Sequence, residues 1–418
     1  MRNEASELAS RPRSAVGWFR ELSPGERRTF WAAFGGFALD GMDILLYSFV
    51  VPTLITLWSM SRADAGLIAT VALLVSAVGG WAGGILADRI GRVRTLQITI
   101  LWFSVFTALS GLTNSFGQLL TVRALQGIGF GAEWAVGAAL MGEMVRPQHR
   151  GKAVGFVQSS WAVGWAAAAI LYAVTYALLP ETVAWRVLFA IGLLPGLFVV
   201  YVRRNVQDSA VFARASHSES FLTIFRPGLL GTTLLGALLA AGVQGGYYAV
   251  MTWLPTYLKS SRHLSVIGSS GYLAVVIVAA WLGYVAGAYI TDALGRRRSF
   301  LLFSVCSVAT VILYTVLPIS DPLMLVLGFP LGFFASGTYS GLGAYLAELF
   351  PTRVRGSGMG FTYNSGRAIG ATFPALVGFL SDRVELGLAI ALFTTCAYGL
   401  VWLALLPLPE SNGRMLSD

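Results

Sequence analysis

Long apolar runs are the feature that most constrains how this chain can fold. Leu67–Ala87, Leu229–Met251 and Leu386–Leu408 each come close to the ~20 residues that a helix needs to cross a bilayer. Backbone N–H and C=O groups find no partners in lipid, so such runs must form helices. Of all residues, 56% are apolar and 12% charged, about half the charged fraction of a soluble domain. The sequence therefore predicts an all-α membrane protein.

Hydrophobic runs separated by polar turns divide the chain into twelve expected transmembrane helices. Their expected positions are 30–58, 66–87, 95–113, 117–141, 152–179, 184–202, 228–258, 267–291, 299–317, 322–347, 357–380 and 386–408.

Basic residues predict the orientation of these helices. Of the 29 Lys and Arg residues, 22 fall in the N-terminal tail, in every second loop or in the C-terminal tail. The opposite loops hold four: Arg62, Lys259, Arg262 and Arg383. Basic loops stay in the cytosol, which predicts a multi-pass protein of the cell inner (plasma) membrane with both termini cytosolic. The net charge of +9 is thus a topology signal and does not indicate nucleic-acid binding.

An internal repeat indicates two halves. Asp88-Arg-Ile-Gly91-Arg92 recurs as Asp292-Ala-Leu-Gly295-Arg296, 204 positions later. Parallel repeats around an axis normal to the membrane are an established transporter plan, with the substrate at their interface. The expected organisation is a cytosolic N-terminal tail (1–29), a six-helix half (30–202), a cytosolic central loop (203–226), a second six-helix half (227–408) and a cytosolic C-terminal tail (409–418).

Two motifs carry a resemblance to a known family. Gly84-Ile-Leu-Ala-Asp88-Arg89-Ile-Gly91-Arg92 resembles the signature between the second and third helices of the major facilitator superfamily. Arg123-Ala-Leu-Gln126-Gly127-Ile-Gly129 resembles the superfamily's fourth-helix motif. The resemblance covers nearly the whole chain and implies the two-half fold of twelve helices.

A narrower resemblance concerns the first helix. Leu39-Asp40-Gly41-Met42-Asp43 is similar to the Asp-Gly-x-Asp of aromatic acid:proton and sialate:proton symporters. Leu254-Pro-Thr-Tyr-Leu258 and Gly360-Phe-Thr-Tyr-Asn364 favour the sialate and monocarboxylate branch. The Gly-Pro pattern that marks many antiporters is missing from 155–175, which argues against efflux by exchange.

Asp40 and Asp43 are the first candidates for chemistry. An ionisable group in a membrane helix costs ~3 kcal/mol or more at mid-membrane and is a functional candidate by default. Their i, i+3 spacing places both on one helix face, where two carboxylates do not easily ionise together. They are candidates for proton coupling. The alternative is a static pair between one of them and Arg123, which is also a substrate-binding candidate.

Arg367 is the second outstanding residue, about 15 Å into its helix. A guanidinium stays charged and can hold a carboxylate through two hydrogen bonds. It therefore predicts an anionic substrate, or else an ion pair between the halves with Asp40. Asn364 and Tyr363 lie about one turn earlier and are further substrate-binding candidates.

Three other groups complete the expected cavity. Glu133 is a second proton-coupling candidate; alternatively, it serves a cytoplasmic gate or bonds a neighbouring helix. Adding 204 to the Asp40 segment leads to Gln244, Tyr247 and Tyr248, which are candidates for hydrogen bonds to the substrate. Trp134, Trp161 and Trp165 could stack on a substrate ring.

Charged residues also recur at the expected cytosolic helix ends. The superfamily resemblance implies that they form a network that latches the cytoplasmic side. The gating candidates are Asp88, Arg92, Glu143, Arg150, Asp292, Arg296, Glu348 and Arg355.

No Walker loop, zinc-ligand spacing or Ser-His-Asp set is present in the sequence, so no enzyme activity, metal or cofactor is expected. The expected function is proton-coupled import of a small organic anion, such as a sugar acid, an aromatic acid or a hydroxy acid. The expected partners are this anion, protons and membrane lipid, with no nucleic acid, and the expected state is a monomer. The alternatives are a drug or metabolite efflux antiporter and a non-transporting membrane sensor.

Overall fold

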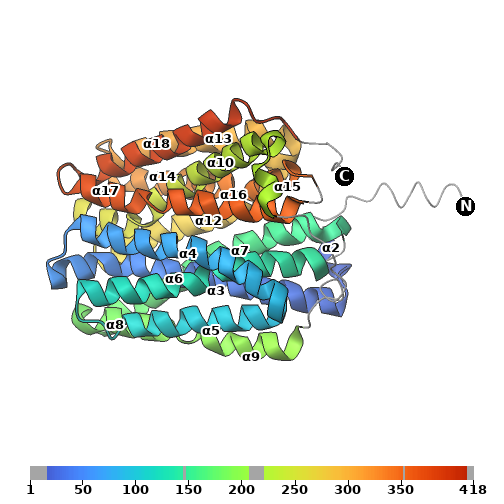
Figure 1. Ribbon diagram of the computed structural model, residues 1–418. Helices are drawn as coiled ribbons and strands as arrows, with labels where there is room; N and C mark the ends of the chain where they lie inside the picture. Colours follow the sequence, from blue (N-terminus) through green and yellow to red (C-terminus); the bar gives the residue numbers. More distant parts are fainter. Residues whose placement is uncertain (1–16, 145–146, 207–220, 352–353, 412–418) are drawn as a thin grey trace, which may run out of the picture.

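The computed structural model describes residues 17–144, 147–206, 221–351 and 354–411. Within these residues all regular structure is helical. Figure 1 shows two bundles of roughly parallel helices, one from each half of the chain. We call the end that carries the short helices α2 (Gly17–Arg20) and α15 (Leu342–Glu348) the inner end, and the opposite end the outer end.

The first bundle contains six expected segments. They are α3 (Pro24–Trp58), α4 (Arg62–Ile90), α5 (Arg92–Ser110), α6 (Phe116–Met144), α7 (Pro147–Leu178) and the pair α8 (Glu181–Ile191) and α9 (Pro195–Asn205). The sixth segment was expected as one helix and is two. Pro195 has no N–H to donate and begins α9, which explains the break.

The second bundle repeats this plan with more interruptions. It contains a 3₁₀ turn η2 (Phe221–Phe225), α10 (Pro227–Met251), α11 (Leu254–Thr256), a π turn η3 (Tyr257–Ser261), α12 (Val266–Leu294), α13 (Arg296–Thr315), α14 (Asp321–Ser340), α15, α16 (Arg355–Gly370), α17 (Phe373–Ser381) and α18 (Leu386–Leu405). The prolines Pro255 and Pro374 lie at the starts of α11 and α17, where a missing N–H costs least.

Together these elements confirm the twelve-segment fold. In the part of the chain that the structure describes, ten segments are long and apolar enough to cross a membrane on their own. The other two are α6, which carries Arg123 and Glu133, and the α16–α17 pair, whose pieces have 16 and 9 residues. Charge and interruption therefore weaken the hydropathy signal in these two segments, whereas α3 keeps it although it carries Asp40 and Asp43.

The first helix begins earlier than its apolar run suggests. Ser23 caps the first turn of α3, and the Glu26 carboxylate accepts a hydrogen bond from the Ser23 N–H. Before it, Trp18 of α2 is 4% exposed and its ring lies 6.0 Å from Phe30 and 5.5 Å from Phe156. The expected boundary between tail and bundle at residue 30 thus falls inside α3.

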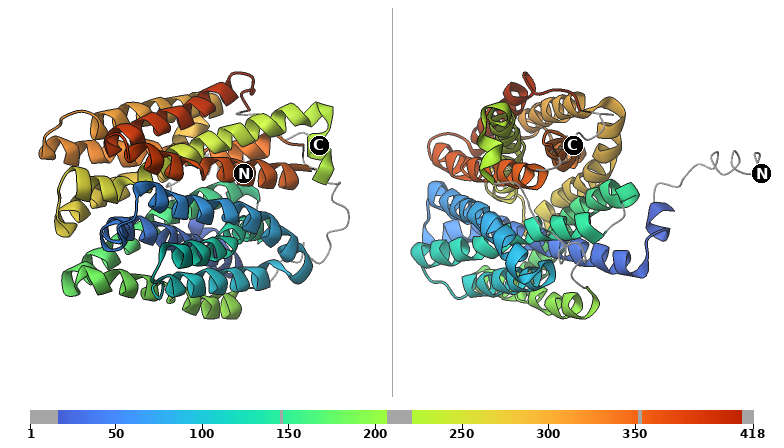
Figure 2. Two further views of the ribbon diagram at one scale, coloured as in Figure 1. Left: turned by 60° about the vertical axis from the view of Figure 1, so that its left-hand side comes forward. Right: turned by 45° about the vertical axis from the view of Figure 1, so that its right-hand side comes forward.

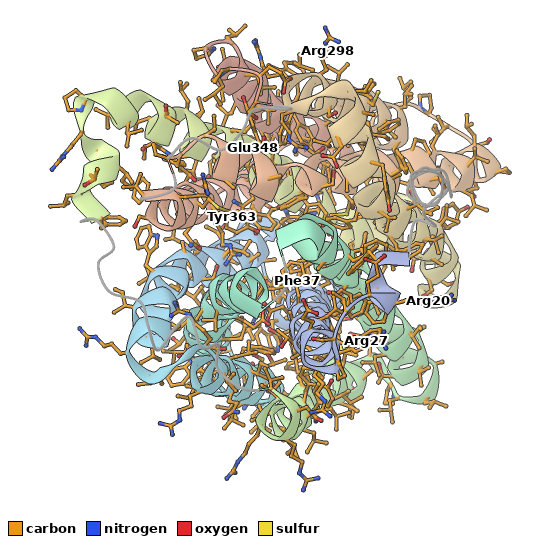
Figure 3. The ribbon with its side chains drawn as sticks, turned by 90° about the vertical axis from the view of Figure 1, so that its right-hand side faces the viewer. Arg20, Arg27, Phe37, Arg298, Glu348 and Tyr363 are labelled. Carbon is orange, nitrogen blue, oxygen red and sulfur yellow. The ribbon has the colours of Figure 1, made fainter. Side chains whose placement is uncertain are left out.

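The two bundles meet along α4, α7, α12, α16 and α17, and Figure 2 shows this seam from two sides. At its outer end the backbones touch: a Cβ on Gly66 would lie 2.9 Å from Ala375 Cα, so only glycine fits this crossing. Figure 3 looks onto the inner end, with Phe37 of α3 and Tyr363 of α16 near the centre, where the bundles meet. The polar groups of the interior gather along this seam.

Candidate substrate and proton site

A narrow central cavity lies between the halves, and both contribute its walls. Phe37, Phe130, Gln158 and Trp161 come from the first bundle, and the second adds Tyr247, Tyr248, Tyr284, Tyr339, Tyr363 and Arg367. Five of these ten residues are tyrosines, which combine flat apolar faces with hydroxyl groups. Of the residues expected from the sequence, Arg367, Tyr247, Tyr248, Tyr363 and Trp161 all line this cavity.

Arg367 is the only cationic residue among the lining residues given above, and it is 2% exposed. Its guanidinium carbon lies 5.0 Å from the ring centroid of Phe130 and 5.1 Å from that of Tyr363. Within the described residues, its Nε and Nη1 have no hydrogen-bond partner. Two buried N–H donors without a partner on a charged group give Arg367 the capacity to bind an anion.

Asp40 of α3 and Glu133 of α6 form a carboxyl pair next to this arginine. They are 0% and 1% exposed. Their side chains interact directly, and the charge of Arg367 acts on both. None of their four carboxyl oxygens has a donor among the residues that the structure describes. Such a pair is stable when the two groups share a proton, because two bare carboxylates in contact repel each other.

A glycine makes this carboxyl pair possible. Gly36 lies one helical turn before Asp40, and the Glu133 carboxyl occupies the space that a side chain at residue 36 would fill. Glu133 can therefore reach across from α6 to the surface of α3. The sequence analysis singled out Glu133 but did not connect it with Asp40 or with Gly36.

Asp43 has different partners from Asp40. Thr107 Oγ1 of α5 and Gln126 Nε2 of α6 both donate to its carboxylate. Its Oδ1 lies 4.0 Å from Nη1 of Arg123. The alternative of a static pair with Arg123 therefore has geometric support, and the charge of Asp43 also acts on Asp40. Thr107 was not foreseen, whereas Gln126 falls one turn after Arg123 in the fourth-helix motif.

Arg123 is as buried as Arg367, with 2% exposure. Its guanidinium carbon lies 5.3 Å from the ring of Tyr47 and 6.0 Å from the ring of Phe189. Its Nε and Nη1 make no hydrogen bond within the described part of the chain. It lines a second cavity, on the outer side of the first.

Two of the remaining polar candidates, Gln244 and Trp161, hold helices together. Gln244 donates to the Tyr363 carbonyl at 2.9 Å and so ties α10 to α16. Trp161 Nε1 donates to the Tyr247 hydroxyl at 2.8 Å, across the two halves. Asn364 lies against Gly80 of α4 and is not among the residues given above for the central cavity. Trp165 is fully buried, and the Trp134 side chain lies outside the described part of the structure.

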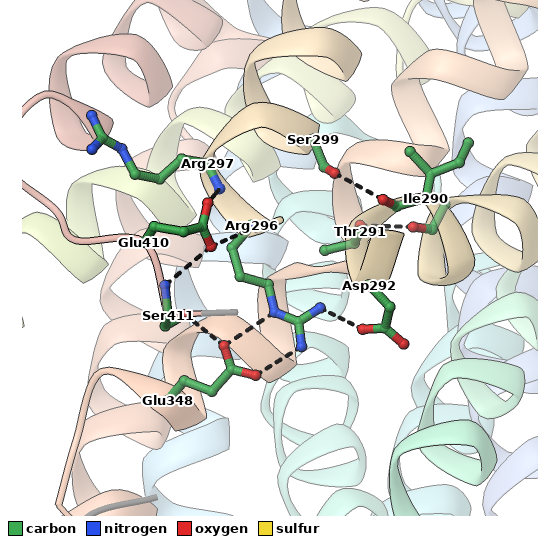
Figure 4. Close-up of polar contacts among 10 residues, drawn as sticks. Ile290, Thr291, Asp292, Arg296, Arg297, Ser299, Glu348, Glu410 and Ser411 are labelled. Carbon is green, nitrogen blue, oxygen red and sulfur yellow. Dashed lines mark hydrogen bonds and ion pairs between the residues drawn. The ribbon is translucent and has the colours of Figure 1, made fainter. Parts of the chain in front are cut away.

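Charged residues at the inner end of the second bundle form one cluster (Figure 4). Arg296 binds Glu348 through two nitrogens, at 3.1 and 2.8 Å, and Asp292 at 2.7 Å. Arg355 Nε donates to the Ala347 carbonyl at 3.0 Å. In the first bundle Arg92 begins α5, whereas the side chains of Asp88, Glu143 and Arg150 lie outside the described residues.

Glu410 is a member of this cluster that the sequence analysis missed. Its carboxylate accepts the backbone N–H groups of Arg296 and Arg297, at 2.8 and 3.0 Å. It thus satisfies two free donors at the start of α13 and complements the positive end of that helix. It had been assigned to the C-terminal tail, and no local signal links it to a residue 114 positions away.

Two six-helix bundles with a polar cavity at their interface define a class of membrane transporters. A model of the Major Facilitator Superfamily matches residues 33–318 and 269–417, and the chain belongs to that superfamily. This confirms the family expected from the sequence motifs.

Curated relatives indicate which members of the superfamily this chain is similar to. The chain is 43% identical over 407 residues to a probable 4-methylmuconolactone transporter of Cupriavidus pinatubonensis, covering 96% of this chain and 94% of the relative. It is 32% identical over 370 residues to the cis,cis-muconate transport protein of Acinetobacter baylyi, covering 86% and 88%. Among solved structures, a D-xylose-proton symporter superposes with a TM-score of 0.74 at 20% identity, over 93% of this chain and 99% of that one, which bears on the fold alone.

Proposed function

We propose that this protein imports a small organic acid anion together with protons. One observation carries the proposal: a buried arginine with unfilled donors, Arg367, lies in an aromatic cavity beside the Asp40–Glu133 carboxyl pair. The named substrates of the two curated relatives, 4-methylmuconolactone and cis,cis-muconate, support an organic acid as the substrate class.

The cavity walls favour a flat or unsaturated acid. Arg367 has unpaired N–H donors that can bind a carboxylate, and the rings of Phe130 and Tyr363 flank the same guanidinium. Tyr284 and Tyr339 also line the cavity from the second bundle. A planar carbon skeleton held between aromatic faces buries its apolar area while its carboxylate stays paired.

Proton coupling follows from competition for Arg367. In the empty cavity, Asp40 is an acidic group whose charge acts on this arginine. A substrate carboxylate that binds Arg367 replaces that interaction and leaves Asp40 against Glu133 without a cation. Taking up a proton then removes a buried unpaired charge, which would otherwise cost several kcal/mol. Anion and proton would thus enter together.

Alternating access requires the outer end to open and close. In this structure, contacts across the halves close that end: the Arg62 backbone N–H donates to Asp382 at 3.1 Å, and Lys259 pairs with Glu181 at 2.9 Å. Both contacts lie near the surface and break at low cost. Rocking of the two bundles around the central cavity is therefore feasible without disturbing their interiors.

The test is uptake into proteoliposomes under an imposed pH gradient. The panel should contain 4-methylmuconolactone, cis,cis-muconate, aromatic acids, sugar acids and hydroxy acids, with D-xylose as the matched neutral control. We expect accumulation of at least one acid when the outside is acidic, and none when the gradient is collapsed. Accumulation driven only by an acidic interior would favour the antiporter, and accumulation of D-xylose alone would refute the anion site.

A further inference from the structure

A second cavity lies on the outer side of the central one and is also built around an arginine. Its lining residues are Ile44, Leu45, Tyr47, Ser48, Ala69, Ala72, Leu73, Arg123, Trp161, Tyr247, Tyr248, Met251 and Thr252. Ala69 is near the start of α4, and Met251 ends α10, which places this cavity toward the outer end. We call it the Arg123 cavity.

The arginine in this cavity has hydrogen-bond donors that its protein neighbours do not pair. Arg123 is 2% exposed, yet its Nε and Nη1 have no hydrogen-bond partner in the described part of the chain. Its acidic neighbour, Asp43, lies 4.0 Å away and accepts from Thr107 and Gln126. A buried guanidinium with two free donors is costly unless something binds it. An anion with oxygen acceptors would pair with this charge and accept from its free donors.

The two cavities share one wall. Trp161, Tyr247 and Tyr248 line both of them. The hydrogen bond from Trp161 Nε1 to the Tyr247 hydroxyl, 2.8 Å long, joins the first half to the second across this wall. A path from the outer end to Arg367 that runs through both cavities would therefore pass Arg123 first and then this shared wall.

We propose that the Arg123 cavity is an outer anion-binding site. A carboxylate binds there transiently before it passes the Trp161–Tyr247 hydrogen bond and reaches Arg367. That the anion is the transported carboxylate rests on the proposed function. That the cavity prefers anions to cations does not depend on it. The competing role for Arg123 is that of a purely structural partner of Asp43. An anion-binding Arg123 favours entry of anionic reagents into the cavity, whereas a purely structural Arg123 does not.

Cysteine labelling tests this selectivity without any substrate. Ser48 lines the Arg123 cavity, and Ser48→Cys is nearly isosteric. Thr252→Cys, at the C-terminal end of α10, is a second reporter in case the first disturbs folding. Both are placed in a background with Cys306→Ser and Cys396→Ser, which removes the free native thiols.

The measurement compares an anionic with a cationic methanethiosulfonate, carrying a sulfonate or a trimethylammonium group, added outside right-side-out vesicles. The ratio of the two labelling rates cancels changes in the thiolate fraction, because both reagents attack the same thiolate. We expect Arg123→Gln to lower the anionic-to-cationic ratio about tenfold, since removing a partly buried charge is worth ~1.4 kcal/mol or more. Arg123→Lys keeps the charge and should keep the ratio, and Arg367→Gln is the matched control in the other cavity.

The proposal is overturned if Arg123→Gln leaves the ratio unchanged at both reporters, or if neither reagent reaches either cysteine from outside. If no acid of the panel is transported, the proposed function fails. The labelling ratio still shows whether the Arg123 cavity selects anions. If an acid is transported, it should slow labelling of Ser48→Cys in the Arg367→Gln variant as well. Loss of that protection in Arg367→Gln would mean a single anion site at Arg367 and would contradict the second one.

Discussion

Asp40 and Asp43 lie three residues apart on α3, and both are buried, yet their surroundings differ in kind. Asp43 accepts hydrogen bonds from Thr107 and Gln126 and lies near Arg123, all within the first bundle. Asp40 has no donor among the described residues; it faces Glu133 and, across the seam between the bundles, Arg367. A carboxylate with its donors in one rigid unit is stable in every state, whereas one without them depends on what lies across the seam.

This difference separates two roles that one sequence motif does not distinguish. If the bundles rock as proposed, the partners of Asp43 move with it, whereas the environment of Asp40 changes when Arg367 binds an anion or moves away. We therefore propose that Asp40 and Glu133 carry the coupling and that Asp43 supports the structure of the first bundle. The predictions below compare the two clusters, from the largest expected effect to the smallest.

The largest effect is expected for proton-driven accumulation. Asp40→Asn removes the carboxyl that competes for Arg367, so accumulation under a pH gradient should fall to the level without a gradient. Exchange of internal for external substrate should survive, because it needs no net proton movement. Asp43→Asn is the matched control, and protein that folds should still accumulate substrate. The assignment is reversed if Asp43→Asn abolishes accumulation and Asp40→Asn does not.

The next effect concerns affinity at Arg367. Arg367→Lys keeps the charge but loses the two-pronged hydrogen bonding, and a hydrogen bond to a charged group contributes about 1.5–3 kcal/mol. Binding of the transported acid should weaken about 10- to 100-fold, as measured by equilibrium binding to purified protein. The ester or amide of the same acid should bind weakly to the native protein. Unchanged affinity in Arg367→Lys would make Arg367 a partner of Asp40 only.

A smaller effect is expected on stability, and here the order of the two aspartates is opposite. Asn at residue 43 brings an NH₂ group toward the donors of Thr107 and Gln126, so Asp43→Asn should lower the free energy of unfolding by about 1–3 kcal/mol. Asp40→Asn has no donors to lose and should leave thermal stability unchanged or raise it. Thermal unfolding in detergent, without substrate, measures both. Equal destabilisation by the two variants would show that the surroundings of Asp40 are not short of donors.

The smallest effect is expected for a cluster that lies within the second bundle alone. Glu410→Gln weakens the interaction with the start of α13, which should cost about 0.5–1 kcal/mol of stability. Because Glu410 and Arg296 move together, substrate accumulation should not change. A loss of accumulation in a variant of normal stability would show that this cluster belongs to the coupling machinery.

The sequence predicts the fold well because its main signals are local. Each run that crosses the membrane carries its own length and hydropathy, and the basic loops predict their sides without any knowledge of contacts. The breaks in the helices are partly readable in the same way, since Pro195 and Pro374 lie at the starts of α9 and α17. The early start of α3 follows from the Ser23 and Glu26 capping pair, which an apolar run does not reveal.

The site is predicted only in part, because residue depth does not say which way a side chain reaches. Asp40, Glu133 and Arg367 are recognisable as costly charges within apolar segments. Their grouping depends on Gly36, which opens a space on α3 for a glutamate 97 positions later in the chain. The split between Asp40 and Asp43 depends in the same way on Thr107, an ordinary residue of α5. Neither dependence has a signature in one sequence.

The central claim is that the carboxyl pair takes up a proton when the anion binds. The most direct test encloses a pH-sensitive dye in proteoliposomes and adds, from outside, the acid that the flux panel identifies. The account predicts that the lumen of vesicles with native protein acidifies in proportion to the acid that enters. In the Asp40→Asn variant, exchange should continue without this acidification. Entry of the acid into native vesicles with no acidification of the lumen would contradict the account.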